Sequence, residues 1–186
     1  METSLPSSDL APLIALSHHR WNIPVLAVLR RQSGGRFVVL ANTLGASRGS
    51  LSTSLENLVE QGLVRRNAGV GHPMRPEYLL TGRGEQVGEH CLKLSLLVDR
   101  RGEADIAYRK WTLPITAAIG GGIRRFNEVR DALGEGVTPR AVTLGLKSML
   151  QEGWAERQLI DDYPPAAGYT LAGPGKAVLR RVDALI

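Results

Sequence analysis

His19-Arg20-Trp21-Asn22-Ile23-Pro24 is the stretch that decides the fold, because Arg109-Lys110-Trp111-Thr112-Leu113-Pro114 repeats its pattern ninety residues later. Each stretch is followed by the same landmarks in the same order. The first copy has Arg36-Phe37, Leu55, Leu58, Gly62-Leu63-Val64 and Tyr78 to Gly84, and the second has Arg125-Phe126, Leu146, Met149, Gly153-Trp154-Ala155 and Tyr169 to Gly175. The offset between the copies varies only from 89 to 91 residues. We therefore predict a duplicated domain.

A length of 186 residues agrees with two small domains, because a segment of about 85 residues can still bury a modest core. We predict a first domain over residues 10–84, opened by a lead-in helix at Leu10 to Leu16, and a second over residues 109–186. Residues 85–108 hold no proline and include a group of aliphatic residues, Leu92, Leu94, Leu96, Leu97 and Val98, which predicts a packed connecting helix. Lys176 to Ile186 is expected to be its shorter counterpart.

The composition, 43% hydrophobic and 22% charged, is typical of a folded soluble protein. No apolar run approaches the roughly 18 residues that a membrane span requires, and Met1 to Asp9 lacks the features of a signal peptide. We expect a cytoplasmic protein without a membrane partner. The single cysteine, Cys91, cannot form an internal disulfide and is expected to be a buried helix residue.

The charge favours an anionic partner. The net charge is +5 and the pI is about 9.8. Of the 23 basic residues 19 are arginines, whose fixed fork of donors suits phosphate and guanine.

Three helices and a hairpin are predicted in the first copy. Trp21, Ile23, Leu26 and Leu29 recur at helical spacing, and Ser33-Gly34-Gly35 ends that helix. A short helix follows at Phe37 to Ala41. Ser47 is a good N-cap for the third, since its hydroxyl can accept a hydrogen bond from an unpaired backbone N–H. The third helix is predicted to bury Leu51, Leu55, Leu58 and Val59, and the strands are Leu63 to Arg66 and Glu77 to Thr81.

The same order of three helices and a hairpin is predicted in the second copy. Gly120-Gly121-Gly122 closes its first helix, and Phe126, Val129 and Leu133 mark the short one. Thr138 is the predicted N-cap of the third helix, with Pro139 at its first position. That helix is predicted to bury Val142, Leu146, Met149 and Leu150.

This order of elements is that of a winged helix-turn-helix. The predicted fold is mainly α-helical with small β-hairpin wings: two tandem winged helix-turn-helix domains that form a pseudo-dimer in one chain.

The landmarks resemble the HxlR-type winged-helix transcriptional regulators. The resemblance rests on Lys110-Trp111-Thr112, Arg125-Phe126-Asn127-Glu128-Val129, the Thr138 helix, Gly153 and Tyr169-Thr170-Leu171 with Gly173 and Gly175. It covers Arg109 to Leu185 well and His19 to Leu92 more loosely. It implies DNA binding, and family members usually dimerise through terminal helices on inverted-repeat DNA. Many carry a redox-sensing cysteine just before the Lys-Trp motif, but neither copy has one there.

We therefore expect a sequence-specific DNA-binding transcriptional regulator, a repressor that binds double-stranded DNA in the nucleoid. The third helix of each copy would read the major groove and the hairpin would contact the backbone. The candidate DNA-binding residues are Ser47, Arg48, Ser50, Ser52, Thr53, Arg65, Arg66 and Arg75 in the first copy and Thr138, Arg140, Ala141, Thr143 and Lys147 in the second.

The two wings differ in charge. The first has Arg65, Arg66 and Arg75 against Glu77, together with His72, whereas the second has Glu156, Asp161 and Asp162 against Arg157. We expect the first wing to hold DNA and the second to contribute little. Because the reading helices differ as well, an asymmetric site is favoured over a perfect palindrome.

Catalytic and cofactor sites are not predicted, and we expect that the protein is not an enzyme. The four histidines lack zinc-ligand spacing. Gly69-Val70-Gly71 and Gly120-Gly121-Gly122 lack the lysine or fingerprint of a nucleotide site. Asp161 and Asp162 are adjacent, so they would point apart in an extended segment. Trp21, Trp111 and Trp154 are expected in the core.

Two other classes stay open. The chain could be a tandem winged-helix module that binds a partner protein, as chromosome-condensation accessory subunits do. It could also respond to an unknown small-molecule effector bound between the copies, around Trp21, Trp111 and the helix of Leu92 to Val98. The oligomeric state, a monomeric pseudo-dimer or a homodimer, is open too.

Overall fold

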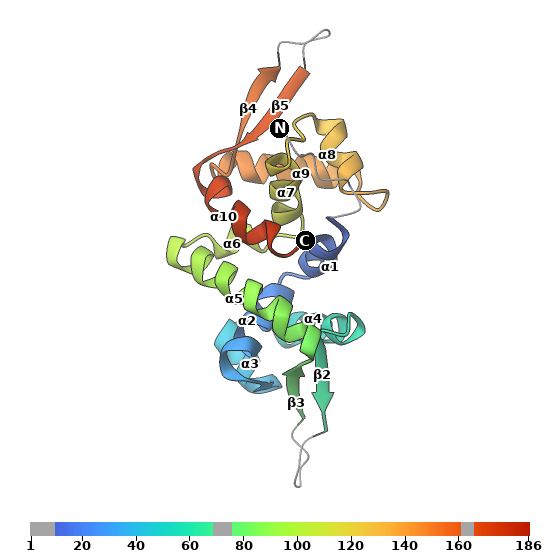
Figure 1. Cartoon of the computed structure of the whole chain (residues 1–186), viewed down its shortest axis with the longest axis vertical. Coiled ribbons are helices and arrows are strands. Elements are labelled where there is room, and N and C mark those ends of the chain that lie inside the picture. The colour runs from blue at the N-terminus through green and yellow to red at the C-terminus, as the bar shows by residue number, and fades with distance from the viewer. Residues whose placement is uncertain (1–9, 69–75, 161–165) are drawn as a thin grey trace. The chain divides into compact units, whose positions relative to one another are not determined.

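A computed structural model describes residues 10–68, 76–160 and 166–186 (Figure 1). By its internal packing the chain divides into two compact units. The first unit is His19–Arg100, and the second joins Arg101–Ile186 to the described residues of Met1–His18. None of the described helices is long and apolar enough to cross a membrane.

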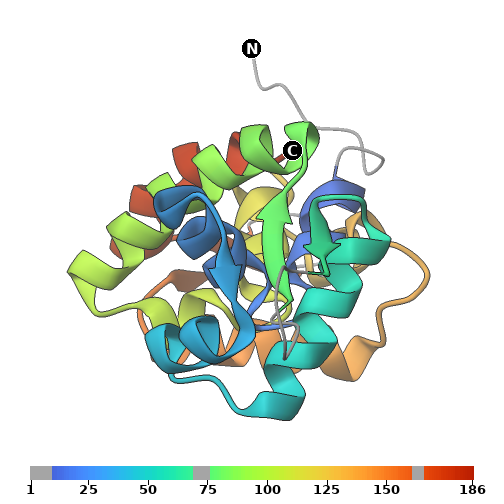
Figure 2. The same cartoon turned by 90° about the horizontal axis from the view of Figure 1, so that it is seen from below.

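The first unit has three helices, a small sheet and a long closing helix. The elements are α2 Asn22–Gln32, β1 Gly35–Arg36, α3 Phe37–Leu44, α4 Arg48–Glu60, β2 Val64–Asn67, β3 Glu77–Leu80 and α5 Gly82–Arg101. The sheet is antiparallel with the order β1-β3-β2, and Figure 2 shows green β3 standing between its two neighbours. Helices α3 and α4 and the β2–β3 hairpin make the predicted winged helix-turn-helix. Strand β1 was not predicted.

The second unit repeats this plan. Its elements are α1 Ala11–Ser17, α6 Ala104–Ala107, α7 Thr112–Gly120, α8 Phe126–Ala132, α9 Pro139–Gln151, β4 Ala155–Ile160, β5 Ala166–Leu171 and α10 Gly173–Asp183. Strands β4 and β5 form an antiparallel hairpin. Where the first unit has strand β1, the second has one isolated bridge between Arg125 and Gly168.

The duplication is visible in the packing of the first helix of each copy. Trp21 and Trp111 are both half-buried, and the eight residues that follow each of them, Asn22 to Leu29 and Thr112 to Ile119, are all buried. Such complete burial is expected for a central helix that is covered on every side. The tandem repeat predicted from the sequence is therefore confirmed at the level of the core.

In each unit one glycine allows the hairpin to pack closely against the helix that follows it. A Cβ atom on Gly84 would collide with the carbonyl oxygen of Leu63, and one on Gly175 would collide with the carbonyl oxygen of Trp154. The same carbonyls accept hydrogen bonds from the N–H groups of Thr81 (3.0 Å) and Ala172 (2.9 Å). Glycine is needed because the backbones approach too closely for any side chain.

Further details differ from the sequence prediction, among them Leu150 of α9, which was predicted to be buried and is half-buried. Helix α1, with Leu10, Leu13 and Leu16 buried, packs against α7 and belongs to the second unit, although the lead-in helix was predicted as part of the first domain. The connecting helix begins earlier, at Gly82, and is interrupted at Gly102 (φ +69°) between α5 and α6. Val59 is 41% exposed and not buried, because one residue beyond Leu58 turns the side chain about 100° away from the core stripe.

Candidate nucleic-acid interface

Both third helices begin at the predicted caps. The Ser47 hydroxyl accepts a hydrogen bond from the Ser50 N–H (3.3 Å) and donates one to the Ser50 hydroxyl (2.9 Å). The Thr138 hydroxyl accepts from the Ala141 N–H (3.2 Å), with Pro139 in the first turn. These bonds satisfy backbone donors that have no partner inside the helix. Ser47 and Thr138 therefore set where α4 and α9 start.

Aligning the two caps shows that the candidate arginines are not equivalent. Arg48 is the first residue of α4 and corresponds to Pro139, whereas Arg140 is the second residue of α9 and corresponds to Gly49. Both arginines are exposed. Because successive helix residues are about 100° apart, the two guanidinium groups leave their helices in different directions.

Two polar side chains on the outward face of α4 form hydrogen bonds within the helix. The Ser52 hydroxyl donates to Oε1 of Glu56 (2.8 Å), and the Thr53 hydroxyl donates to the carbonyl oxygen of Gly49 (3.1 Å). Ser52 is half-buried, and the other three residues are exposed. The hydroxyl oxygens of Ser52 and Thr53 can still accept hydrogen bonds from a ligand.

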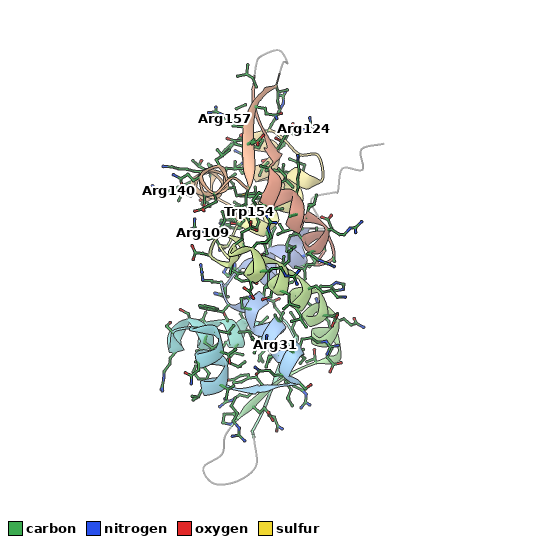
Figure 3. The ribbon with its side chains drawn as sticks, turned by 90° about the vertical axis from the view of Figure 1, so that its left-hand side faces the viewer. Arg31, Arg109, Arg124, Arg140, Trp154 and Arg157 are labelled. Carbon is green, nitrogen blue, oxygen red and sulfur yellow. The ribbon has the colours of Figure 1, made fainter. Side chains whose placement is uncertain are left out.

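The outward face of α9 is cationic. Arg140, Thr143 and Lys147 are exposed, and the Thr143 hydroxyl donates to the Pro139 carbonyl oxygen (2.9 Å). Ala141 is half-buried, and Leu144, at the corresponding place to Thr53, is 55% exposed. Figure 3 labels Arg140 at this helix and Arg157 and Arg124 beside the hairpin of the same unit.

A depression lies between α4 and the hairpin of the first unit, with a volume of about 460 Å³. Its lining residues come from α3, α4, β2 and β3: Phe37, Ser52, Leu55, Glu56, Val59, Glu60, Arg66 and Tyr78. The structure thus brings Arg66 of the wing to the same depression as Ser52 of the helix.

Arg65 lies on the other side of the hairpin. It lines a second depression of about 240 Å³ together with Leu29, Arg30, Ser33, Leu79, Leu80 and Glu85. Successive side chains of a strand point to opposite faces, so the two neighbouring arginines are separated. Of the two predicted wing contacts, Arg66 is therefore the one that faces the candidate reading helix.

The wing residues of the second unit carry mixed charge. Glu156 and Arg157 are exposed at the start of β4. His72 and Arg75 of the first wing and Asp161 and Asp162 of the second lie outside the described residues, as does the Gly69-Val70-Gly71 stretch.

The sequence reasoning missed three arginines at the start of the short helices. Arg36 and Arg125 are the N-cap residues of α3 and α8, with nearly the same extended backbone (φ −85°, ψ 149° and φ −83°, ψ 147°). The Arg125 N–H donates to Oε2 of Glu128 (3.0 Å), and the Tyr169 N–H donates to the carbonyl oxygen of Arg124 (2.9 Å). The repeated Arg-Phe landmark was the available signal, because a cation beside a helix start and a wing suits a backbone phosphate.

The cysteine and the tryptophans lie in surroundings that indicate a structural role. Cys91 is completely buried in α5, and burial raises the pKa of its thiol far above the ordinary value. Trp154 is 1% exposed and belongs to the core, as predicted. Trp21 and Trp111 each carry a cation on the ring, Arg20 at 5.7 Å and Lys110 at 5.0 Å from the centroids. Within the described ranges, no three His, Cys, Asp or Glu side chains could together hold a metal ion.

Comparison with known proteins agrees with this geometry. Residues 16–105 and 106–186 each match the family described as HxlR-like helix-turn-helix, a family of DNA-binding regulators. Neither the curated proteins nor the solved structures gave a match. The two matched segments together cover almost the whole chain, one for each copy. The chain therefore belongs to the HxlR-like helix-turn-helix family, as a tandem of two family domains.

Proposed function

We propose that this chain is a sequence-specific transcriptional regulator that represses by occupying promoter DNA, with α4 and α9 as its two reading helices. The observation that supports this most is the repeated placement of a capped helix with an exposed polar face beside a β-hairpin, once in each family domain. A helix of this width enters the major groove of B-DNA, where base edges can be read.

The exposed side chains suit the two tasks of a DNA-binding surface. Arg48 and Arg140, in the first turns of their helices, can each donate two hydrogen bonds to guanine. Arg66 in the wing supplies a cation for the phosphate backbone, which fixes register and orientation. One chain then supplies the two modules that a one-domain regulator obtains by dimerisation.

The first test selects bound duplexes from a random DNA pool with the purified chain, with its mass measured by light scattering in the same buffer. We expect a two-part motif with its parts about one helical turn apart, bound by one chain. Placing the selected site over a promoter should lower transcription in a purified system. Absence of any enriched motif would remove the proposal, and higher transcription would remove the repressor role.

The reading helices are tested by Arg48→Ala with Arg140→Ala. Each bidentate contact to guanine contributes about 1–3 kcal/mol, so the double variant should bind the selected site about 100-fold more weakly. The matched control is Arg31→Ala with Arg100→Ala, which removes the same charge from exposed positions in α2 and α5. Circular dichroism should show both variants folded. Equal losses in the two variants would mean that only net charge matters.

One observation favours a second function, binding of a partner protein through the first unit. Val38 and Val39 on α3 are 59% and 46% exposed, close in sequence to Phe37 of the α4 depression. The second unit has Asn127 and Glu128 at the corresponding positions. Salt separates the two functions, because counterion release makes DNA affinity fall steeply with added salt, whereas an apolar protein contact does not show that dependence.

A further inference from the structure

One stripe on each reading helix differs between the units in a systematic way. Gly49, Ser52 and Glu56 follow the N-cap of α4 by two, five and nine residues, and Arg140, Thr143 and Lys147 follow the N-cap of α9 by the same numbers. These spacings of three and four residues place each set on one face of its helix. The core residues Leu51, Leu55 and Leu58, and Val142, Leu146 and Met149, occupy the opposite side.

The middle of the stripe is the same kind of residue in both units. Ser52 and Thr143 are both hydroxyl residues, so the divergence is confined to the two ends. At the first end, glycine replaces arginine, and a Cβ atom on Gly49 would meet open space. At the second end, the first unit has the carboxylate of Glu56 where the second unit has the ammonium group of Lys147.

Glu56 is held in position on the candidate DNA-facing side. Its Oε1 accepts the hydrogen bond from Ser52 at 2.8 Å, and the residue lines the depression that Arg66 of the wing also lines. The bond with Ser52 uses one carboxylate oxygen and leaves the other able to accept. Lys147 is exposed on α9, a helix that contains no acidic residue.

We propose that Glu56 and Lys147 give the two half-sites opposite base preferences at corresponding positions, cytosine under the first unit and guanine under the second. The inference rests on the proposed function of α4 and α9 as reading helices. The Glu56 carboxylate accepts a hydrogen bond from the cytosine N4 amino group, and the Lys147 ammonium donates to O6 and N7 of guanine.

The same groups reject the wrong base. Guanine presents only the acceptors O6 and N7 at its major-groove edge, so a carboxylate placed there has no donor and repels them. Cytosine presents an amino donor, which a lysine ammonium cannot accept from. Specificity of this kind comes from an unpaired or repelled group as much as from the correct contact.

The resulting operator cannot be a perfect inverted repeat. In a palindrome both half-sites carry the same base at corresponding positions, and one of the two units would then face the base that it rejects. The divergence at Glu56 and Lys147 thus assigns each unit to one half-site and gives the bound chain a fixed direction on DNA.

The test repeats the random-pool selection with the wild type, Glu56→Lys and Lys147→Glu. Glu56→Lys should change one position of one half-site from cytosine to guanine and leave the other half-site unaltered, and Lys147→Glu should do the reverse in the other half-site. Binding assays on two duplexes that differ only by cytosine or guanine at that position should show a preference of about 5- to 150-fold, and the substitution should reverse which duplex is preferred.

Glu60→Lys is the matched control, since it makes the same charge change one turn further along α4 in a residue that lines the same depression. It should tighten binding to all sequences without changing any preferred base. If the wild type selects a motif but Glu56→Lys behaves like Glu60→Lys, the inference is wrong while the proposed function stands. If the folded wild type selects no motif, both are wrong.

Discussion

Among the helix and wing strand that form the candidate interface of each unit, the net positive charge lies on strand β2 in the first unit and on helix α9 in the second. Strand β2 has Arg65 and Arg66 and no acid, and helix α4 has one arginine against two glutamates. Helix α9 has Arg140 and Lys147 and no acid, and strand β4 has one glutamate and one arginine. The positive charge that could attract phosphate therefore lies on a different element in each of the two duplicated surfaces.

The cores show the opposite behaviour, because corresponding core positions have kept their burial. Leu58 and Met149, Leu63 and Trp154, and Cys91 and Val182 are pairs of buried residues at corresponding places. Close packing restricts what a core position accepts, while an exposed position tolerates changes of charge at little cost in stability. Duplication has thus preserved the fold of each copy and left its ligand-facing surface free to diverge.

One contact between the first helix and the closing helix of each unit has diverged, because the larger side chain lies on a different helix in each unit. In the first unit Arg30 of α2 lies beside Gly88 of α5, where a Cβ atom would be 3.4 Å from Cβ of Arg30. In the second unit the residue that corresponds to Arg30 is Gly120, and the residue that corresponds to Gly88 is Leu179, which covers Gly120. The space is filled in both units, but from opposite helices.

The largest expected effect tests what the two units share. Gly84→Ala and Gly175→Ala each push a methyl group into a backbone carbonyl oxygen, and each should lower the free energy of unfolding by about 3 kcal/mol. Thermal and urea unfolding measure the loss. Gly49→Ala is the control, because a Cβ atom there meets nothing. A loss in only one of the two variants would contradict the equivalence of the two hairpins.

The exchanged contact between α2 and α5 gives the next effect. Gly88→Leu should destabilise the first unit by about 1–3 kcal/mol through overpacking against Leu80 and Arg30. Adding Arg30→Gly reproduces the arrangement of the second unit and should recover part of the loss. A double-mutant cycle measures the coupling, expected at about 0.5 kcal/mol or more. Strict additivity would show that the two positions do not share one space.

The wings give a smaller effect, measured on DNA. Arg66→Ala should weaken binding to all sequences alike and reduce the salt slope by about one, since one phosphate contact is lost. Arg65→Ala should change the slope less, because Arg65 lies on the other side of the hairpin. Glu156→Ala in the second wing should strengthen binding slightly. Equal slopes for the two arginine variants would refute the separation of their roles.

The smallest effect is a pH dependence confined to the first unit. Lys93, which bonds Glu89 at 3.1 Å, and then Arg30, at 3.3 Å, lower the pKa of the Glu89 carboxyl below its ordinary value of 4.5. A lowered pKa in the folded state contributes stability above pH 4.5 that is lost as the pH falls through the folded pKa. Because 38% of the Glu89 side chain is exposed to solvent, which screens the charges, the contribution is small.

The free energies of unfolding of the wild type and of Glu89→Gln, measured from pH 3 to pH 7 in steps of about one pH unit, show this dependence. The two curves should converge at the acid end of the series. Arg180 occupies the corresponding place in α10, so Arg180→Gln is the matched control and should leave the difference between acid and neutral pH unaltered.

Local patterns in the sequence were enough for most of the fold. The helix starts at Ser47 and Thr138 followed from single hydroxyl residues ahead of periodic leucines, and both were confirmed. The buried stripe of α4 was predicted except at two positions: the polar Ser54 is buried without having been predicted, and the apolar Val59 is exposed. Strand β1 has only two residues, too few to show any periodicity.

The candidate site was predicted less completely. The sequence indicated the helices and wings on which the candidate residues lie, but it treated Arg65 and Arg66 as one pair and did not single out Arg36, Arg124 or Arg125. Assigning a strand residue to one face requires the pairing register, in which Arg66 stands opposite Tyr78 and Arg65 opposite Leu79. That register depends on residues more than ten positions away.

The sequence by itself determined that the chain is a tandem of two winged helix-turn-helix domains, because caps, turns and apolar periodicity act over a few residues and were repeated at a constant offset. The tertiary structure decided which unit helix α1 packs in, which wing arginine faces helix α4, and why Gly84 and Gly175 cannot be replaced. Each of these depends on contacts between segments distant in sequence, whose geometry no local pattern specifies.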